Sequence, residues 1–221
     1  MRIMMRSRMM LLTMGLLMVT ACSRSRETAS FAPAEDALYV TREGAITSAV
    51  IVTYENEYYT EEELKASVEE ALADFNGSEG HGASDEASSR EAAAFNSCSL
   101  AGGTASLYID FKNPAAYLKF MEAYPDEESS IQVKELDVTP VPDGITKGYL
   151  TGQTFKTASS SPKEVDASEV MKKSKLYVAA IEGPALIQTE GPIEYVSSEV
   201  TVLGSTLVQT PETGMVYVIF K

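Results

Sequence analysis

Residues suited to covalent or metal chemistry are scarce in this chain of 221 residues, which has two cysteines and one histidine. Cys22 directly follows Val19-Thr20-Ala21, whereas Cys98 and His81 stand apart from each other and from Cys22. A cysteine thiolate is a nucleophile that can form a thioether. A small residue such as Ala21 lets a protease approach the bond before the cysteine. This spacing makes Cys22 the residue for which the sequence predicts a covalent modification.

The segment before Cys22 has the parts of an export signal. Three arginines precede an apolar run, Met9–Val19, and no acidic residue comes before Glu27. The run has about eleven residues, within the 7–15 that are typical of a secretory signal and well short of the roughly 20 that cross a bilayer. We therefore expect residues 1–21 to direct export and to be removed.

Val19-Thr20-Ala21-Cys22 resembles the lipobox of bacterial lipoproteins. This resemblance implies that a diacylglyceryl group carrying palmitate-type chains is attached to Cys22 and that the leader is cut before it. Two acyl chains anchor a protein stably, whereas one does so only marginally. The expected location is the extracytoplasmic face of the cell membrane. The alternatives are an ordinary signal peptide with a chance cysteine and an uncleaved anchor.

The charge of the chain excludes several classes of partner. The formal net charge is −14, and removal of the three leader arginines leaves 15 basic against 32 acidic residues, a net charge of −17. Such a surface repels nucleic acid and anionic lipid headgroups, so we expect no nucleic-acid partner. It favours solubility, cationic partners or loosely bound divalent ions.

Catalytic and metal-binding patterns are weak. A Ser-His-Asp or Cys-His arrangement needs a rigidly held histidine, and the single histidine lies in Gly80-His81-Gly82 within a stretch of Gly, Ser, Ala, Asp and Glu. We expect His81 to be a solvated loop residue, the alternative being a metal ligand. Cys98 lies in a strand-like run without nearby cations, so we expect a small buried residue and not a reactive thiol. No cofactor site is expected.

Two stretches of the chain have the pattern of a hairpin followed by a helix. Ala37–Thr41 and Ala45–Tyr54 are joined by a turn at Gly44, and Thr60-Glu61-Glu62-Glu63 is a capping box that predicts a helix ending near Gly77. Tyr54, Tyr58 and Tyr59 either pack beside this helix or form an exposed aromatic patch.

The second stretch follows the same order. Ala93–Leu100 and Ala105–Phe111 predict a hairpin, and Asn113-Pro114 opens a helix that stops before Pro125. We expect residues 140–152 to form a loop and Val165–Lys173 a short helix. Six short runs rich in Val, Ile, Leu and Tyr then follow: Lys175–Glu182, Ala185–Thr189, Ile193–Val196, Val200–Leu203, Thr206–Gln209 and Met215–Phe220.

These patterns predict an α+β protein. Its parts are a signal peptide at 1–21, a flexible tether at 22–36, an α+β domain at 37–160 and a β-rich unit at 161–221. The α+β domain is an antiparallel sheet built from two hairpin–helix units, and the last unit is a small sandwich or barrel-like structure.

Three segments resemble a group of uncharacterised lipoproteins from Gram-positive gut bacteria. They are residues 54–64, Ile193–Val202 and Met215–Lys221. The resemblance covers nearly the whole chain after the leader and implies a lipid-anchored envelope protein. It adds no catalytic residue, so that only Cys22 is carried over.

Two hypotheses about function follow from this. The first is a non-enzymatic binding or structural protein that holds a protein, peptide or cell-wall component through its β surface. The second is a carboxylate-dependent hydrolase of envelope sugars or peptides, since 32 acidic residues are present. A deep pocket with two carboxylates of mutually shifted pKa would favour the hydrolase. A shallow surface with a contiguous apolar patch would favour the binding protein.

Overall fold

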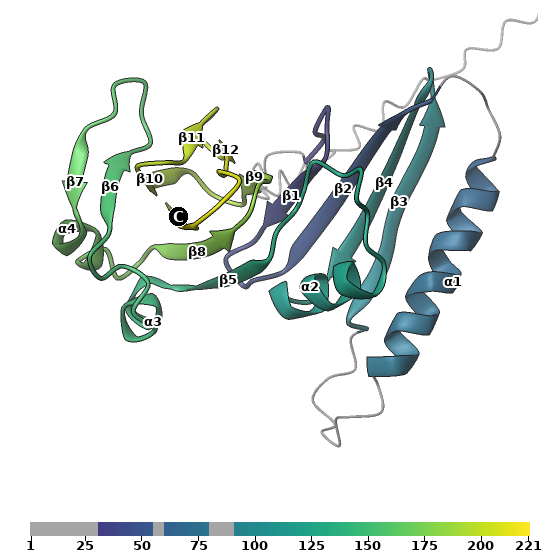
Figure 1. Ribbon diagram of the computed structural model, residues 1–221, viewed down its shortest axis with the longest axis horizontal. Coiled ribbons are helices and arrows are strands. Elements are labelled where there is room, and N and C mark those ends of the chain that lie inside the picture. Colours follow the sequence, from purple (N-terminus) through teal and green to yellow (C-terminus); the bar gives the residue numbers. More distant parts are fainter. Residues whose placement is uncertain (1–30, 55–59, 80–90) are drawn as a thin grey trace, which may run out of the picture.

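The fold is mixed α/β, and more of the described chain lies in strands, which form two sheets, than in helices (Figure 1). The computed structural model describes residues 31–54, 60–79 and 91–221. One sheet has seven strands and the other has six. Both sheets are open, and neither closes into a barrel within these residues.

The seven-stranded sheet combines the N-terminal strands with strands from the C-terminal part of the chain. Its strands, from edge to edge, are β11 (Thr201–Val202), β12 (Leu207–Gln209), β9 (Leu186–Thr189), β1 (Ala37–Val40), β2 (Ile46–Thr53), β4 (Thr104–Phe111) and β3 (Ala93–Ala101). The pairs β1–β2, β2–β4 and β3–β4 are antiparallel, and β1 pairs with β9 in parallel.

The six-stranded sheet is entirely antiparallel. Its strands, in order, are β5 (Glu135–Pro140), β8 (Tyr177–Glu182), β13 (Met215–Phe220), β10 (Ile193–Ser197), β6 (Thr154–Thr157) and β7 (Glu164–Asp166). The helices of the described residues are α1 (Glu61–Glu79), α2 (Pro114–Ala123), α3 (Val141–Thr146) and α4 (Ala167–Met171).

The two longer helices begin where their capping residues predict. In α1 the Glu63 amide donates to the Thr60 hydroxyl (3.2 Å), and the Thr60 amide donates to the Glu63 carboxylate (2.9 Å). The bonds that the Glu63 carboxylate accepts from the Thr60 amide and from the Thr60 hydroxyl lower its pKa below the usual value. In α2 the Asn113 side chain accepts from the amide of Ala116, and Pro114 at the first helical position has no amide N–H that would need an acceptor.

The loop predicted at 140–152 is wrong in its first half, because α3 occupies Val141–Thr146. Pro140 before the helix, and Pro142 and Gly144 within it, hide the helix from its pattern. Burial compensates for that poor propensity. The Val141 side chain is fully buried, and its amide donates to the carbonyl of Leu176 (2.9 Å). The predicted helix at Val165–Lys173 is confirmed as the shorter α4, which is capped by Asp166.

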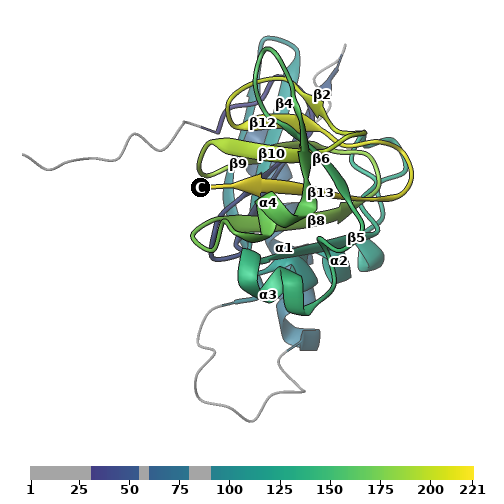
Figure 2. The ribbon, with the colours of Figure 1, turned by 90° about the vertical axis from the view of Figure 1, so that its left-hand side faces the viewer.

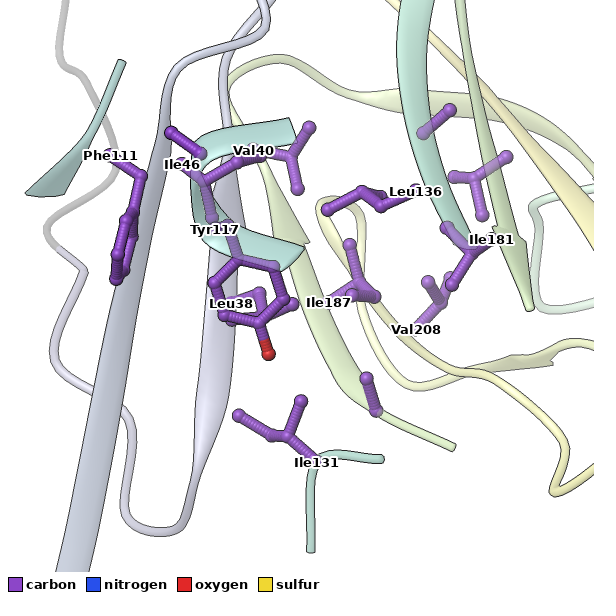
Figure 3. Close-up of a cluster of buried hydrophobic side chains, with 14 of the residues drawn as sticks. Leu38, Val40, Ile46, Phe111, Tyr117, Ile131, Leu136, Ile181, Ile187 and Val208 are labelled. Atoms are coloured by element: carbon purple, nitrogen blue, oxygen red, sulfur yellow. The ribbon is translucent and has the colours of Figure 1, made fainter. Parts of the chain in front are cut away.

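A single apolar layer lies between the two sheets (Figure 3). Because side chains alternate across a strand, one face of each sheet carries a continuous apolar row. The buried residues on these facing rows include Leu38, Val40, Ile187 and Val208 from the seven-stranded sheet and Leu136, Ile181, Val218 and Phe220 from the six-stranded sheet. Burial of each such side chain contributes about 1.5–3 kcal/mol.

The opposite face of the six-stranded sheet has a second core. Val178 and Ile219 on that face pack with Val141, Leu150 and Val170, which come from α3, α4 and the connection between them. In the view of Figure 2, α4 lies in front of this sheet, and α3 lies below its edge strand β5. The six-stranded sheet is therefore buried on both faces.

The expected division after residue 160 does not coincide with a division between the sheets. It falls between β6 and β7, which pair with each other. The strands after it are shared, since β9, β11 and β12 join the seven-stranded sheet and β8, β10 and β13 join the six-stranded sheet. The parallel pairing of β1 with β9 places C-terminal strands in one sheet with the N-terminal strands. These strands therefore do not form the separate small sandwich or barrel-like unit that the sequence predicts.

The connection from β8 to β9 carries the chain from one sheet to the other. The buried Thr210 hydroxyl donates to the carbonyl of Gly183 (2.7 Å) and accepts from the amide of Ala185 (2.8 Å). Gly183 has φ +107°, and a Cβ there would lie 2.2 Å from the carbonyl oxygen of Gln132. Only glycine fits this close approach.

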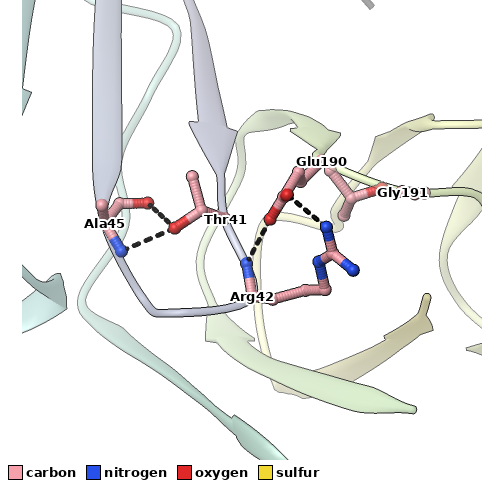
Figure 4. A network of polar contacts seen from close by, with 6 residues as sticks. Thr41, Arg42, Ala45, Glu190 and Gly191 are labelled. Carbon is pink, nitrogen blue, oxygen red and sulfur yellow. Dashed lines mark hydrogen bonds and ion pairs between the residues drawn. The ribbon is translucent and has the colours of Figure 1, made fainter. Parts of the chain in front are cut away.

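A polar contact links the turn after β1 to the residue after β9 (Figure 4). The Glu190 carboxylate forms an ion pair with the Arg42 guanidinium and accepts from the Arg42 amide (3.0 Å). Within the turn, the Thr41 hydroxyl accepts from the amide of Ala45 (2.9 Å). These contacts fix the end of the parallel β1–β9 pair.

Replacement of Thr210 with valine tests the crossover. T210V keeps the side-chain volume but leaves the Ala185 amide and the Gly183 carbonyl without this partner in a buried position, so the free energy of unfolding should fall by about 1–3 kcal/mol. Urea unfolding measures this change. The matched control is T201V in the exposed edge strand β11, which should change stability by less than about 0.5 kcal/mol. Equal effects of the two substitutions would contradict the role given to Thr210.

Candidate functional site

Several residues singled out in the sequence lie outside the described residues. These are Cys22, His81, Tyr58 and Tyr59. Tyr54 is described, and its amide donates to the carbonyl of Gly103 (2.9 Å), which joins the end of β2 to the β3–β4 turn. The aromatic patch and the metal-ligand alternative for His81 therefore stay predictions.

Cys98 lies on β3 facing α1 and is half-buried. Its Sγ lies 3.8 Å from the carbonyl oxygen of Glu61. Burial and the neighbouring carboxylate of Glu61 raise the pKa of the thiol above its usual value. A raised pKa reduces the thiolate fraction at neutral pH, so this environment does not favour a nucleophile.

Three carboxylates with shifted pKa values, those of Glu63, Asp137 and Asp166, belong to local structural contacts. The pKa of Glu63 and that of Asp166 are lowered by the helix-capping bonds that they accept. Burial alone would raise the pKa of Asp137, but hydrogen bonds from Lys147 and Tyr149 lower it overall. A general acid at neutral pH needs a raised carboxyl pKa, which these three groups lack. In residues 31–54, 60–79 and 91–221, no cluster of three or more acidic, histidine or cysteine side chains can hold a metal ion.

An apolar cavity of about 260 Å³ lies between the seven-stranded sheet and its two helices. Its floor is formed by β2 and β4, one wall by α1, and the other by α2 and the segment after it. The side chains that line it include Val50, Leu107 and Ile109 from the floor, Val68 and Ala71 from α1, and Phe120, Met121 and Tyr124 from α2 and its C-terminal end. This cavity is the candidate functional site.

The cavity exists because α1 covers the edge of the sheet and not its centre. Asn76 of α1 accepts from the Ala93 amide (3.0 Å) and donates to the Ala93 carbonyl (2.7 Å), which pairs the helix with the edge strand β3. Leu72 and Phe75 are buried there, whereas Val68 is only partly buried. The centre of the sheet beside α1 is left to form the cavity floor.

Aromatic rings make the wall on the α2 side rigid. The Phe120 ring packs against Phe75 (5.3 Å, edge to face), Phe111 (5.3 Å) and Tyr124 (4.8 Å between ring centroids). The Tyr124 hydroxyl also donates to the carbonyl of Ala71 in α1 (3.1 Å). The last residues of α2 are thereby tied to the opposite wall, so the cavity is largely preformed.

The deep end of the cavity is closed by Tyr117 and by a loop that is held by Asp36. The Asp36 carboxylate accepts from the amides of Ile51 (2.7 Å) and Ser130 (3.2 Å) and from the Ser129 hydroxyl (2.8 Å). Burial, and to a lesser degree the charge of Asp36, raise the pKa of Tyr117 far above its usual value. Tyr117 is therefore a neutral phenol at physiological pH.

A second, more polar cavity of about 490 Å³ adjoins the first. Tyr117, Met121, Asp126 and Ile131 line both. The remainder of the larger cavity carries charged side chains of both signs, namely Lys119, Glu122, Glu127 and Lys134. An apolar group in the smaller cavity would thus lie beside a polar rim, which is the usual anatomy of a protein interface.

The lining of the apolar cavity suits binding better than catalysis. Its polar side chains are Ser48, Ser67, Ser129, Asp126 and the tyrosines, and no histidine or cysteine is among them. A serine nucleophile needs an adjacent base, and the sequence offers no other histidine than His81. The sequence predicted the α1 stripe Leu64, Val68, Leu72 and Phe75 but assigned it wholly to packing. The lateral position of α1 on the sheet, which leaves the cavity open, has no signal in the sequence.

Comparisons with protein-family models, with curated proteins and with solved structures find no match to this chain. Among the helices that the structure describes, none has the length and apolarity needed to span a membrane.

The cavity should bind a neutral apolar probe. We expect N-phenyl-1-naphthylamine to bind the folded protein saturably with one site, as measured by its fluorescence. Ala71→Phe places a ring inside the cavity and should weaken binding at least about tenfold, since the apolar area available to the probe is lost.

Ala115→Phe is the matched control, because it adds the same ring at an exposed position of α2 outside the cavity. It should leave probe binding within about twofold of the original value. Equal binding by the two variants would show that the probe binds elsewhere and would contradict the cavity as a ligand site.

Proposed function

We propose that this chain is a lipid-anchored protein of the cell envelope that binds a protein or peptide partner and catalyses no reaction. The observation that carries the binding role is the preformed apolar cavity between α1, α2 and the seven-stranded sheet. The anchoring role rests on the sequence before and at Cys22.

The anchor proposal is supported by four features that occur together. Arginines precede a short apolar run, the run ends at small residues, and Cys22 follows directly. A polar stretch then separates Cys22 from the first described residue, Phe31. This proposal also includes a location on the extracytoplasmic face of the cell membrane. It further includes membership in the group of lipoproteins from Gram-positive gut bacteria that residues 54–64, Ile193–Val202 and Met215–Lys221 resemble.

The binding proposal is supported by the size and lining of the cavity. At about 260 Å³ it is smaller than the roughly 300–1,000 Å³ of sites that hold whole cofactors or drug-sized ligands. It suits one large apolar side chain of a partner, with the adjoining charged cavity receiving polar neighbours of that side chain. Such an anchor in a preformed pocket supplies much of the affinity of a protein interface.

We also propose that residues 37–123 form two successive hairpin–helix units. The antiparallel pairs β1–β2 and β3–β4 are each followed in the chain by a helix, α1 and α2 respectively. The likeness of the two units lies in the order of their elements and not in residue identity.

Cys22→Ser tests the anchor. Serine cannot form the thioether, so the variant should keep its leader or leave the membrane fraction, whereas the original chain should fractionate with membrane and lack residues 1–21. Cell fractionation with intact mass measurement gives both results. Cys98→Ser is the matched control and should fractionate like the original. A processed, membrane-bound C22S protein would contradict the proposal.

A further inference from the structure

A third cavity, of about 420 Å³, lies at one end of the six-stranded sheet, away from the candidate site. The segment between α4 and β8 forms one side, the start of β10 another, and the residue after β13 a third. The side chains that matter here are Lys172, Lys173, Lys175, Glu194, Tyr195 and Lys221.

The sheet register brings these side chains together. Tyr177 at the start of β8 pairs with Phe220 at the end of β13, and Phe220 pairs with Ile193 at the start of β10. The amide of Lys221 then donates to the carbonyl of Pro192 (3.0 Å). Three neighbouring strands therefore have their ends in one row, which places Lys221 beside the lysines that precede β8.

The charge of this cavity is opposite to that of the chain. The sequence has 32 acidic against 18 basic residues, whereas four lysines and one glutamate line the cavity. A recess lined mainly by one sign of charge concentrates the electrostatic potential and attracts ions of the other sign. The excess of cations in this cavity therefore contrasts with the net acidic charge of the chain.

Only part of the positive charge is neutralised. The Lys221 ammonium lies 2.6 Å from the Glu194 carboxylate, and the Lys172 ammonium lies 2.6 Å from that of Glu169. The Lys173 ammonium lies 5.9 Å from the centre of the Tyr195 ring, a contact that holds the cation without cancelling its charge. Lys175 has no carboxylate partner in the described part of the chain. Lys173 and Lys175 are therefore the cations left to bind an external anion.

We propose that this cavity binds a phosphate group through Lys173 and Lys175, with Lys172 and Lys221 at its margins. Lysine binds phosphate as a point charge, so a pair of ammonium groups in a recess suits the several oxygens of a phosphate. A phospholipid headgroup and a soluble phosphorylated molecule offer the same chemistry. This site is independent of the proposed apolar site, since the two share no lining residue.

The test follows backbone amide shifts by NMR in the intact chain while inorganic pyrophosphate is added, with sodium chloride of equal ionic strength as reference. We expect saturable shifts at residues 172–176, 194–195 and 221. Lys173→Gln with Lys175→Gln should weaken binding about tenfold. The control pair K112Q with K163Q removes the same charge at exposed positions outside the cavities and should change binding less than about twofold.

Two short-chain lipids identify the source of the phosphate. A lipid headgroup is supported as the ligand if dihexanoyl phosphatidylglycerol gives the same shifts and competes with pyrophosphate, and dihexanoyl phosphatidylcholine does neither. Saturation by pyrophosphate alone supports the site with a soluble ligand. Shifts no larger than those of sodium chloride, or binding that K173Q with K175Q leaves unchanged in a folded protein, would overturn the proposal.

Discussion

The apolar layer between the two sheets is the interaction on which the rest of the structure depends. Leu38 and Ile187 on one side and Ile181 and Val218 on the other are fully buried, although they come from strands far apart in the chain. The layer needs both sheets, since each supplies one apolar face. It also requires the chain to cross between them, as it does from β8 to β9. The buried Thr210 and the close approach at Gly183 fix that crossing.

The arrangement of layers explains why the apolar cavity lies where it does. The six-stranded sheet covers the part of the seven-stranded sheet that includes β1, β9 and β12, and α1 and α2 cover the part that includes β2, β4 and β3. Because α1 is bound to the edge strand through Asn76, a gap remains above Val50 and Leu107. The Tyr124–Ala71 hydrogen bond links the two walls of this gap. The candidate site is thus a consequence of where one helix is attached.

Local signals in the sequence predicted the elements and the pairing of strands within each hairpin, but not the pairing of strands far apart in the chain. The Thr60 capping box and the Asn113-Pro114 pair gave the starts of α1 and α2, because caps depend on residues within one turn. The parallel pairing of Leu38 with Ile187 joins residues 149 positions apart, and no local pattern encodes it. Helix α3 was missed because burial of Val141 outweighs the poor helix propensity of its neighbours.

The same contrast between local and long-range features applies to the proposed sites. Cys22 is predicted from adjacent residues, because export and lipid attachment depend on a short linear pattern. The apolar cavity and the lysine cluster depend on the lateral position of α1 and on the register that brings Lys221 to Lys173. These are properties of the tertiary structure. The sequence shows the residues that line the two cavities but does not predict that the fold brings them together.

The central claim is that an envelope-bound chain holds a partner in the apolar cavity, and photo-crosslinking in intact cells tests it most directly. A photoreactive phenylalanine analogue at Ser67 lies at the cavity, whereas the same analogue at Glu70 lies on α1 outside it. The account predicts a discrete adduct in the membrane fraction from position 67 that is absent from position 70 and is lost when Ala71→Phe fills the cavity. Adducts that are the same from both positions, or that persist with the cavity filled, would contradict it.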